Sequence, residues 1–278
     1  MTQKETEQNM LMEYIADTCK IDINEKIDYP PVCLSYGEKV LQSDKGDSII
    51  PIALGTYGNL SVVTAPPKTR KSFFCSLLAS AYLSNKNIYG GDIKGHRKNG
   101  DLIYIDTEQG NWHASKVFRR PLDMDTNIPK DKYHTFALRT IGYKDRLEFI
   151  KHYLKENIKE PSLLILDGVA DLCADVNNIE QSNELVSELM RLSQQQKVHI
   201  INVIHQNYGS SKLGTGHLGS ALEKKAEMVI SLEANTINKN WTTVKCGRSR
   251  GYSFDTFSFE VNEKGLPIIV GDLYDPLK

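Results

Sequence analysis

Short apolar runs alternate with segments of helical periodicity through the middle of the chain. Most of these runs are nearly continuous in apolar residues, as expected for strands that are buried on both faces. The predicted strands are residues 60–64, 102–106, 163–167, 199–205 and 228–232. The spacing of apolar residues between them predicts helices at residues 72–83, 112–121, 144–155, 180–196 and 219–227. This alternation predicts an α/β fold, a mainly parallel twisted sheet with helices on both faces.

The N-terminal part of the chain departs from this pattern. Residues 8–19 have helical spacing, and Tyr29-Pro30-Pro31 then breaks the chain as an extended linker. We therefore expect residues 1–35 to form a helix with a proline linker. Residues 36–278 are expected to form one domain.

The C-terminal part changes character as well. It contains three strand-like segments, and the last two are joined by a turn with the sequence Asn262-Glu-Lys-Gly265. Short segments joined in this way predict an antiparallel extension of the sheet. The segments are residues 241–246, 253–261 and 267–270.

Composition excludes several classes of protein. The 278 residues are 40% apolar and 25% charged, which excludes a disordered chain, collagen and a coiled coil as descriptions of the whole. The polar start and the lack of a long apolar run predict a soluble, cytoplasmic protein without a membrane segment. Five scattered cysteines without a C-x-x-C pair predict free thiols. The net charge of -1 means that DNA binding would need a local patch or a shared channel.

One loop carries the most specific chemistry. The strand that starts at Leu60 runs into a short polar loop, and the loop ends in Lys71-Ser72 at the head of a helix. This is the setting of a nucleotide phosphate loop. Backbone N–H groups and the positive helix end face the phosphates, a lysine reaches the β/γ oxygens, and a hydroxyl binds Mg²⁺.

The usual pattern of such a loop, G-x-x-x-x-G-K-[ST], is not matched. Ala65 and Arg70 stand where the two glycines are expected. A side chain at position 70 must point away from the phosphates or add a cation near the γ-phosphate. The alternative interpretation is a basic loop before an ordinary core helix.

Two later strands end in acids. The strand 102–106 ends in Asp106-Thr-Glu108, and the strand 163–167 ends in Asp167-Gly. A single acid after an apolar strand is the pattern of the Mg²⁺-water ligand in phosphate-loop NTPases. Each strand alone is weak support, but three such βα units in this order are hard to obtain by chance.

With these motifs the chain resembles the RecA-like/DnaB-like branch of P-loop ATPases. The resemblance extends to hexameric helicases of the plasmid RepA type and to AAA-family ATPases of mobile elements and phages. Some of the latter have a loop of the form G-K-A-x-S-R-K-[ST]-F, which Arg70-Lys71-Ser72-Phe73 matches. The resemblance covers about residues 50 to 260 and implies a RecA-like core with ATP and Mg²⁺ as cofactors.

The resemblance also implies roles for individual residues. Glu108 orients the attacking water, with Asp106 as the competing candidate or as a helix cap. Ser72 binds Mg²⁺ directly and Asp167 binds it through water. Gln206 follows the fourth strand and senses the γ-phosphate. The nucleotide is bound by Ala65, Pro66, Pro67, Lys68, Thr69, Arg70, Lys71, Ser72 and Phe73.

Two basic segments are implied to act between molecules. Lys212 and His217 lie in a glycine-rich segment that contacts DNA, or they belong to an ordinary surface loop. Lys245, Arg248 and Arg250 reach the γ-phosphate of a neighbouring subunit, or they form a solvated basic hairpin. The first role of these cations requires a homo-oligomer, expected to be a hexameric ring.

We therefore expect a Mg²⁺-dependent ATP hydrolase, a helicase or translocase on single-stranded DNA that serves replication or mobilisation of a phage or mobile element. The alternatives are a recombination or annealing ATPase of the RecA/RadA kind and a nucleotide-binding switch without turnover.

Overall fold

The computed structural model describes residues 3–42, 44, 46–87, 92–206 and 214–270. Its contacts divide the chain into two units, Met1–Pro30 and Pro31–Lys278. The first unit contains helix α1 (Gln3–Cys19), which buries none of its side chains. No described helix is both long enough and apolar enough to cross a membrane.

The second unit is built on a nine-stranded sheet within the described residues, in the order β12-β11-β10-β9-β3-β8-β7-β5-β6. All neighbours from β9 to β6 pair in parallel, and β10, β11 and β12 extend the sheet antiparallel. The predicted fold class is confirmed. The strands are β3 (Leu60–Ala65), β5 (Leu102–Asp106), β6 (Tyr133–Ala137), β7 (Ser162–Asp167), β8 (Val198–His205), β9 (Met228–Ala234), β10 (Trp241–Ser249), β11 (Phe257–Val261) and β12 (Pro267–Val270).

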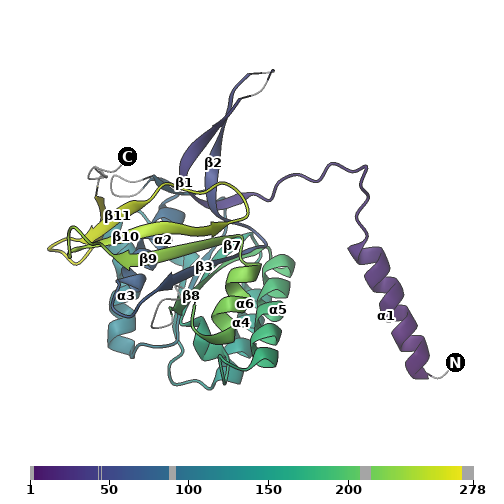
Figure 1. The fold of residues 1–278 in the computed structure, drawn as a ribbon. Coiled ribbons are helices and arrows are strands. Elements are labelled where there is room, and N and C mark those ends of the chain that lie inside the picture. Colours follow the sequence, from purple (N-terminus) through teal and green to yellow (C-terminus); the bar gives the residue numbers. More distant parts are fainter. Residues whose placement is uncertain (1–2, 43, 45, 88–91, 207–213, 271–278) are drawn as a thin grey trace. The chain divides into compact units, whose positions relative to one another are not determined.

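Helices cover both faces of this sheet (Figure 1). One core cluster holds residues of α2 and α3, and a second holds residues of α4, α5 and α6. β3, β5, β7 and β8 contribute to both clusters, which is why their sequences are apolar on both faces. The bounds are α2 (Lys71–Ser84), α3 (Asn111–Met124), α4 (Tyr143–Asn157), α5 (Ile179–Gln195), α6 (Gly216–Lys225), and the short 3-10 helices η1 (Lys130–Lys132) and η2 (Val169–Leu172).

Several elements were not predicted. A small sheet of β2 (Ser48–Thr56), β1 (Val32–Leu41) and β4 (Ile93–Gly95) precedes and interrupts the alternation, and the β1–β2 hairpin projects from the body in Figure 1. The edge strand β6 was also missed. Its residues are all half-buried, so its sequence lacks the apolar run of the central strands.

Several predicted boundaries were wrong. α1 begins at Gln3 and not at residue 8, and β10 continues to Ser249 and not only to residue 246. α3 continues past Pro121 to Met124. Pro121 has no N–H to donate within the helix, but this removes only one helical hydrogen bond. The last turn still forms, and the Asp125 N–H donates to the Pro121 carbonyl oxygen. β11 begins at Phe257 and not at residue 253. Phe254 instead packs edge-on against the Tyr36 ring, 5.7 Å between centroids. α6 begins at Gly216, before the predicted start at residue 219.

Candidate nucleotide site

The carboxyl ends of β3, β8, β7 and β5 meet at one edge because these strands are consecutive neighbours in the sheet. The parallel register places Ala65 opposite His205 and Asp106 opposite Asp167. Ligands of open parallel sheets bind outside the carboxyl ends of the strands. The phosphate loop and both acidic strand ends therefore form one candidate site.

The phosphate loop is a tight turn between β3 and α2. The Thr69 hydroxyl donates to the Pro66 carbonyl oxygen (2.6 Å) and closes the turn from within. Lys68 and Arg70 have φ angles of 65° and 63°, in the left-handed region that glycine adopts most easily. In an L-residue this conformation costs about 1 kcal/mol or more. α2 begins directly afterwards at Lys71, so the backbone N–H groups of its first turn face the loop.

The Arg70 side chain is directed away from the loop. Its Nη1 donates to the Thr242 hydroxyl on β10 (3.1 Å). Of the two orientations considered from the sequence, the structure has the first, in which the side chain leaves the phosphate side open. The missing second glycine therefore does not by itself obstruct the loop.

Lys71 lies in a chain of three polar side chains. Its Nζ is 2.9 Å from His205 Nδ1, and His205 Nε2 is 3.7 Å from Glu108 Oε1. Burial lowers the pKa of Lys71, while the Glu108 and Asp167 carboxylates raise it. The contact with His205 and the charge of Lys71 hold the pKa of Glu108 below its usual value against the effect of burial. The arrangement places a cation, Lys71, and a carboxylate, Glu108, close together at the sheet edge.

Asp167 is nearly buried and accepts hydrogen bonds from two hydroxyl groups. Its Oδ2 accepts from Ser72 Oγ (3.0 Å) and from the Tyr104 hydroxyl (3.1 Å). Burial, followed by the nearby Asp106 carboxylate, raises the pKa of Asp167 to about 6. A hydroxyl beside a carboxylate is an oxygen donor set that suits Mg²⁺, which takes few protein ligands and completes its shell with water and phosphate. The residues predicted to hold Mg²⁺ therefore fit the ion.

Asp106 and Glu108 have different surroundings. Asp106 is 1% exposed and accepts the N–H groups of Glu108 (2.9 Å) and Gln109 (2.8 Å), and the Gln109 side-chain amide (2.7 Å). Asp106 thus closes the turn that precedes α3, but it does not cap the helix as the alternative had it, because the N-cap residue is Gly110. The Glu108 side chain is 46% exposed. Of these two carboxylates, Glu108 is therefore the one accessible to solvent.

Two of the three C-terminal cations lie on β10, and Arg250 follows directly after it. Lys245 pairs with Glu233 (2.8 Å) in the middle of the strand. Arg250 donates through Nη2 to the Lys225 carbonyl oxygen, and Arg248 is exposed. Since β10 is antiparallel to β9, which runs parallel to β3, and Thr242 lies at the phosphate-loop end, Arg248 and Arg250 lie at the opposite end. These two arginines cannot serve the phosphate loop of their own chain.

Comparison with known proteins identifies the chain. The sequence profile of the AAA domain family matches residues 51–211, more than half of the chain. The chain belongs to the AAA domain family. No curated protein matches it.

Two solved structures share the fold of this AAA domain. One is the ATPase domain of another protein, with 13% identity and a TM-score of 0.55, over 77% of this chain and 85% of that chain. The other is the flagellar accessory protein FlaH from Methanocaldococcus jannaschii, with 15% identity and a TM-score of 0.53, over 78% and 91%. The predicted RecA/DnaB-like P-loop ATPase core is confirmed.

Three predicted positions lie at or after the end of β8. The Gln206 side chain is 7% exposed and donates to the Thr64 hydroxyl of β3 (3.1 Å). The side chain that contacts Lys71 is that of His205. The sequence showed polar side chains at the end of this strand, but not which one faces the loop. His217 is exposed at the start of α6, and Lys212 lies outside the described residues.

Two further residues of the AAA domain support the site and were not predicted to do so. The Tyr104 hydroxyl holds Asp167, although its sequence position marks only a strand residue. Arg120 of α3 stacks on the Phe73 ring, 3.8 Å from its centroid, and donates to the Ser72 carbonyl oxygen (3.3 Å).

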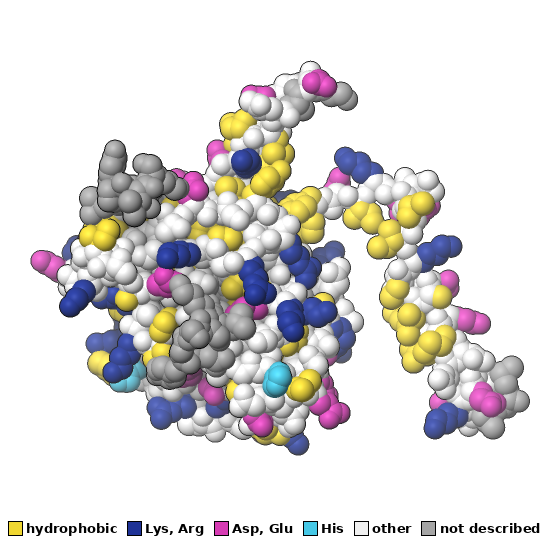
Figure 2. Space-filling model, viewed as in Figure 1, with side chains coloured by type: hydrophobic (Ala, Val, Ile, Leu, Met, Phe, Trp, Pro, Cys, Tyr) yellow, Lys and Arg dark blue, Asp and Glu magenta, His cyan; other side chains and the backbone are white. Residues whose placement is uncertain are grey.

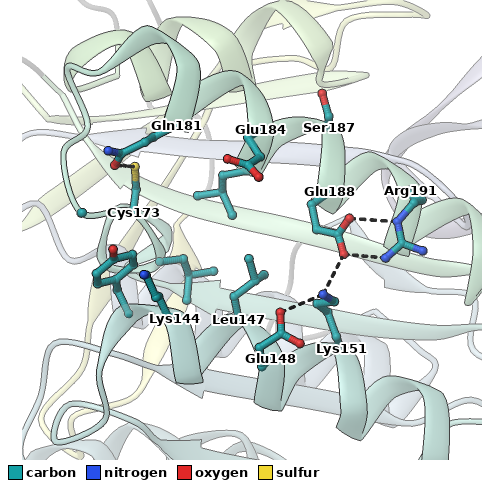
Figure 3. A pocket seen from close by; sticks show the side chains of 14 residues that line it. Lys144, Leu147, Glu148, Lys151, Cys173, Gln181, Glu184, Ser187, Glu188 and Arg191 are labelled. Atoms are coloured by element: carbon teal, nitrogen blue, oxygen red, sulfur yellow. Dashed lines mark hydrogen bonds and ion pairs between the residues drawn. The ribbon is translucent and has the colours of Figure 1, made fainter.

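A separate groove of about 720 Å³ lies between α4 and α5 (Figure 3). At one end Glu188 contacts Lys151 (3.6 Å) and Arg191 (2.5 Å), so the charges there neutralise one another. No residue predicted to bind nucleotide, metal or DNA lines this groove.

Asp167→Asn is expected to stabilise the AAA domain in EDTA at neutral pH. The pKa of Asp167 in the folded chain is about 6, above the ordinary value of 3.8, so the stabilising contribution of this one group is complete below pH 4 and is lost as the pH rises through 6. Ionising this group costs about 3 kcal/mol, and its removal raises the melting temperature by several degrees. Thermal unfolding between pH 4 and 8 measures this. Asp171→Asn, a more exposed neighbour, is the control. An unchanged or lower melting temperature for Asp167→Asn contradicts the assignment.

Proposed function

We propose that this chain is a Mg²⁺-dependent ATP hydrolase of the RecA/DnaB type that works in the cytoplasm as an oligomer on single-stranded DNA. The supporting observation is the meeting of Lys71, the Ser72–Asp167 pair and Glu108 at one sheet edge. Phosphoryl transfer needs positioned charges more than covalent chemistry, and these groups supply them.

The site residues divide the work as follows. The backbone N–H groups at the head of α2 bind the phosphates, and Lys71 exchanges its contact with His205 for the β/γ oxygens. Ser72 and Asp167 would hold Mg²⁺, and the bound ion would neutralise charge on the phosphates. Glu108, held by His205, orients a water and accepts its proton as the water oxygen bonds to the γ-phosphorus and ADP leaves.

Lys71→Ala is expected to abolish ATP binding and turnover together. Without the ammonium group, the β/γ-phosphate charge lacks its nearest cation. Phosphate release and calorimetry with Mg²⁺ and ATP measure the two effects. Lys98→Ala, at an exposed position outside the phosphate loop, is the control. Wild type that binds ATP tightly and does not hydrolyse it would indicate a switch, and wild type that does neither would end the proposal.

The DNA part of the proposal rests on cations and on oligomer geometry. Exposed Lys224 and Lys225 follow His217 on α6, and Figure 2 shows several Lys and Arg side chains on the face that carries α6 and the neighbouring strands. Such a local patch can bind phosphates although the whole chain is nearly neutral. Arg248 and Arg250 fit a role at a neighbouring subunit, because their own loop lies at the other end of β10.

A hexameric helicase-like motor and a recombination ATPase would use the same chemistry. They differ in assembly, since a heterologous contact either closes into a ring or continues as a filament. Size analysis with nucleotide and a single strand separates them. A closed hexamer supports the motor, and open-ended polymers support the recombination ATPase.

A further inference from the structure

Arg70 is an unusual residue for its backbone conformation. Its φ and ψ of 63° and 32° are in the left-handed region, and it directly precedes the helix that would bind the phosphates. Glycine adopts this conformation without strain, while an arginine needs surroundings that hold it there. The question is what holds the loop in this form.

The contacts of the guanidinium group point to one partner. Among the described residues, no carboxylate pairs with Arg70, and its side chain donates to the Thr242 hydroxyl at 3.1 Å. Thr242 is fully buried and is fixed on both sides, since it pairs with Ala234 of β9 and Phe259 of β11. A hydroxyl held between two strands is a rigid anchor for a loop residue.

We infer that Thr242 is a positioning residue for the phosphate loop. Its hydrogen bond with Arg70 stabilises the left-handed backbone conformation that a glycine at position 70 would adopt without strain. The bond keeps the arginine side chain off the phosphate side and holds the left-handed turn that opens α2. The antiparallel extension is thereby part of the nucleotide site. This inference rests on the proposed ATP binding.

A double-mutant cycle tests the inference. Thr242→Val keeps the shape of the side chain and removes the acceptor. In the wild-type background it is expected to weaken ADP and ATP binding about five- to tenfold, the range for one lost hydrogen bond. In an Arg70→Gly background the same change is expected to alter binding less than about twofold, because no side chain remains to be held. Titration calorimetry with Mg²⁺ gives the affinities.

The neighbouring Thr243→Val is the matched control. Thr243 lies on the same strand, but its hydroxyl contacts Asn235 and Ser258 and not the loop. Melting temperatures of all variants separate a loss of binding from a loss of folding. Equal weakening by Thr242→Val in both backgrounds, or no weakening in the Arg70 background, overturns the inference and leaves the proposed function standing. Wild type without nucleotide binding removes both.

Discussion

Glu108→Gln is expected to lower the rate of ATP hydrolysis by about 10²- to 10³-fold while ATP binding stays within a fewfold of wild type. Glutamine keeps the size of the side chain and its reach toward His205, but it cannot accept a proton from water. The contact with His205 and the charge of Lys71 lower the pKa of Glu108, so the carboxylate form of the wild type persists into mildly acidic solution. Single-turnover phosphate release at saturating ATP measures the chemical step.

Asp106→Asn is the informative companion of this variant. Asp106 accepts the N–H groups of Glu108 and Gln109, and asparagine can still accept them through its amide oxygen. Its hydrolysis rate is expected to fall much less than that of Glu108→Gln. If Asp106→Asn loses hydrolysis and Glu108→Gln keeps it, the attacking water is held by Asp106 and the assignment of Glu108 is wrong.

Arg250→Ala is expected to reduce turnover by about 10³-fold through the site of a neighbouring subunit. Arg250 lies at the end of β10 remote from Thr242 and the loop, so it cannot stabilise charge at its own site. An arginine that reaches the γ-phosphate from the next subunit neutralises the charge of the transition state. Steady-state turnover at saturating ATP measures the loss.

Mixing two inactive variants tests whether this residue acts between subunits. Arg250→Ala chains keep an intact phosphate loop, and Lys71→Ala chains keep an intact Arg250. At equal ratio about a quarter of the interfaces join one complete loop to one complete arginine, so about a quarter of the wild-type activity is expected to return. No recovery at any ratio would show that Arg250 does not act in trans. Arg248→Ala in the same design decides between the two arginines.

Within the core, the sequence pattern was a good guide to the sheet. Strands buried on both faces must be apolar along their whole length, so β5, β7 and β8 are visible without knowledge of their neighbours. The small sheet and β6 were not predicted, because their strands are not apolar along their whole length. β6 is an edge strand whose residues are all half-buried, and β1 passes from buried to exposed residues along its length, so neither has a strong period of two.

The candidate site shows the same division. The sequence predicted those site residues whose type and neighbours along the chain indicate a role. Lys71-Ser72, which follows a strand and a short polar loop, is an example. His205, Tyr104 and Arg120 were not, because their contribution depends on which side of a strand or helix they occupy. Gln206 was predicted without that information, and its side chain donates to the Thr64 hydroxyl.

The sequence by itself determined the fold class, the order of the βα units and the acids that end two strands, because local apolar period and strand-end chemistry are properties of contiguous residues. Only the tertiary structure decided that β3, β8, β7 and β5 are neighbours, so that Ser72 meets Asp167 and Lys71 meets His205. It also decided the orientation of Arg70, since the Thr242 hydroxyl that receives it lies 172 residues away along the chain. Contacts over such separations follow from sheet order and packing, and neither is encoded in any single stretch of sequence.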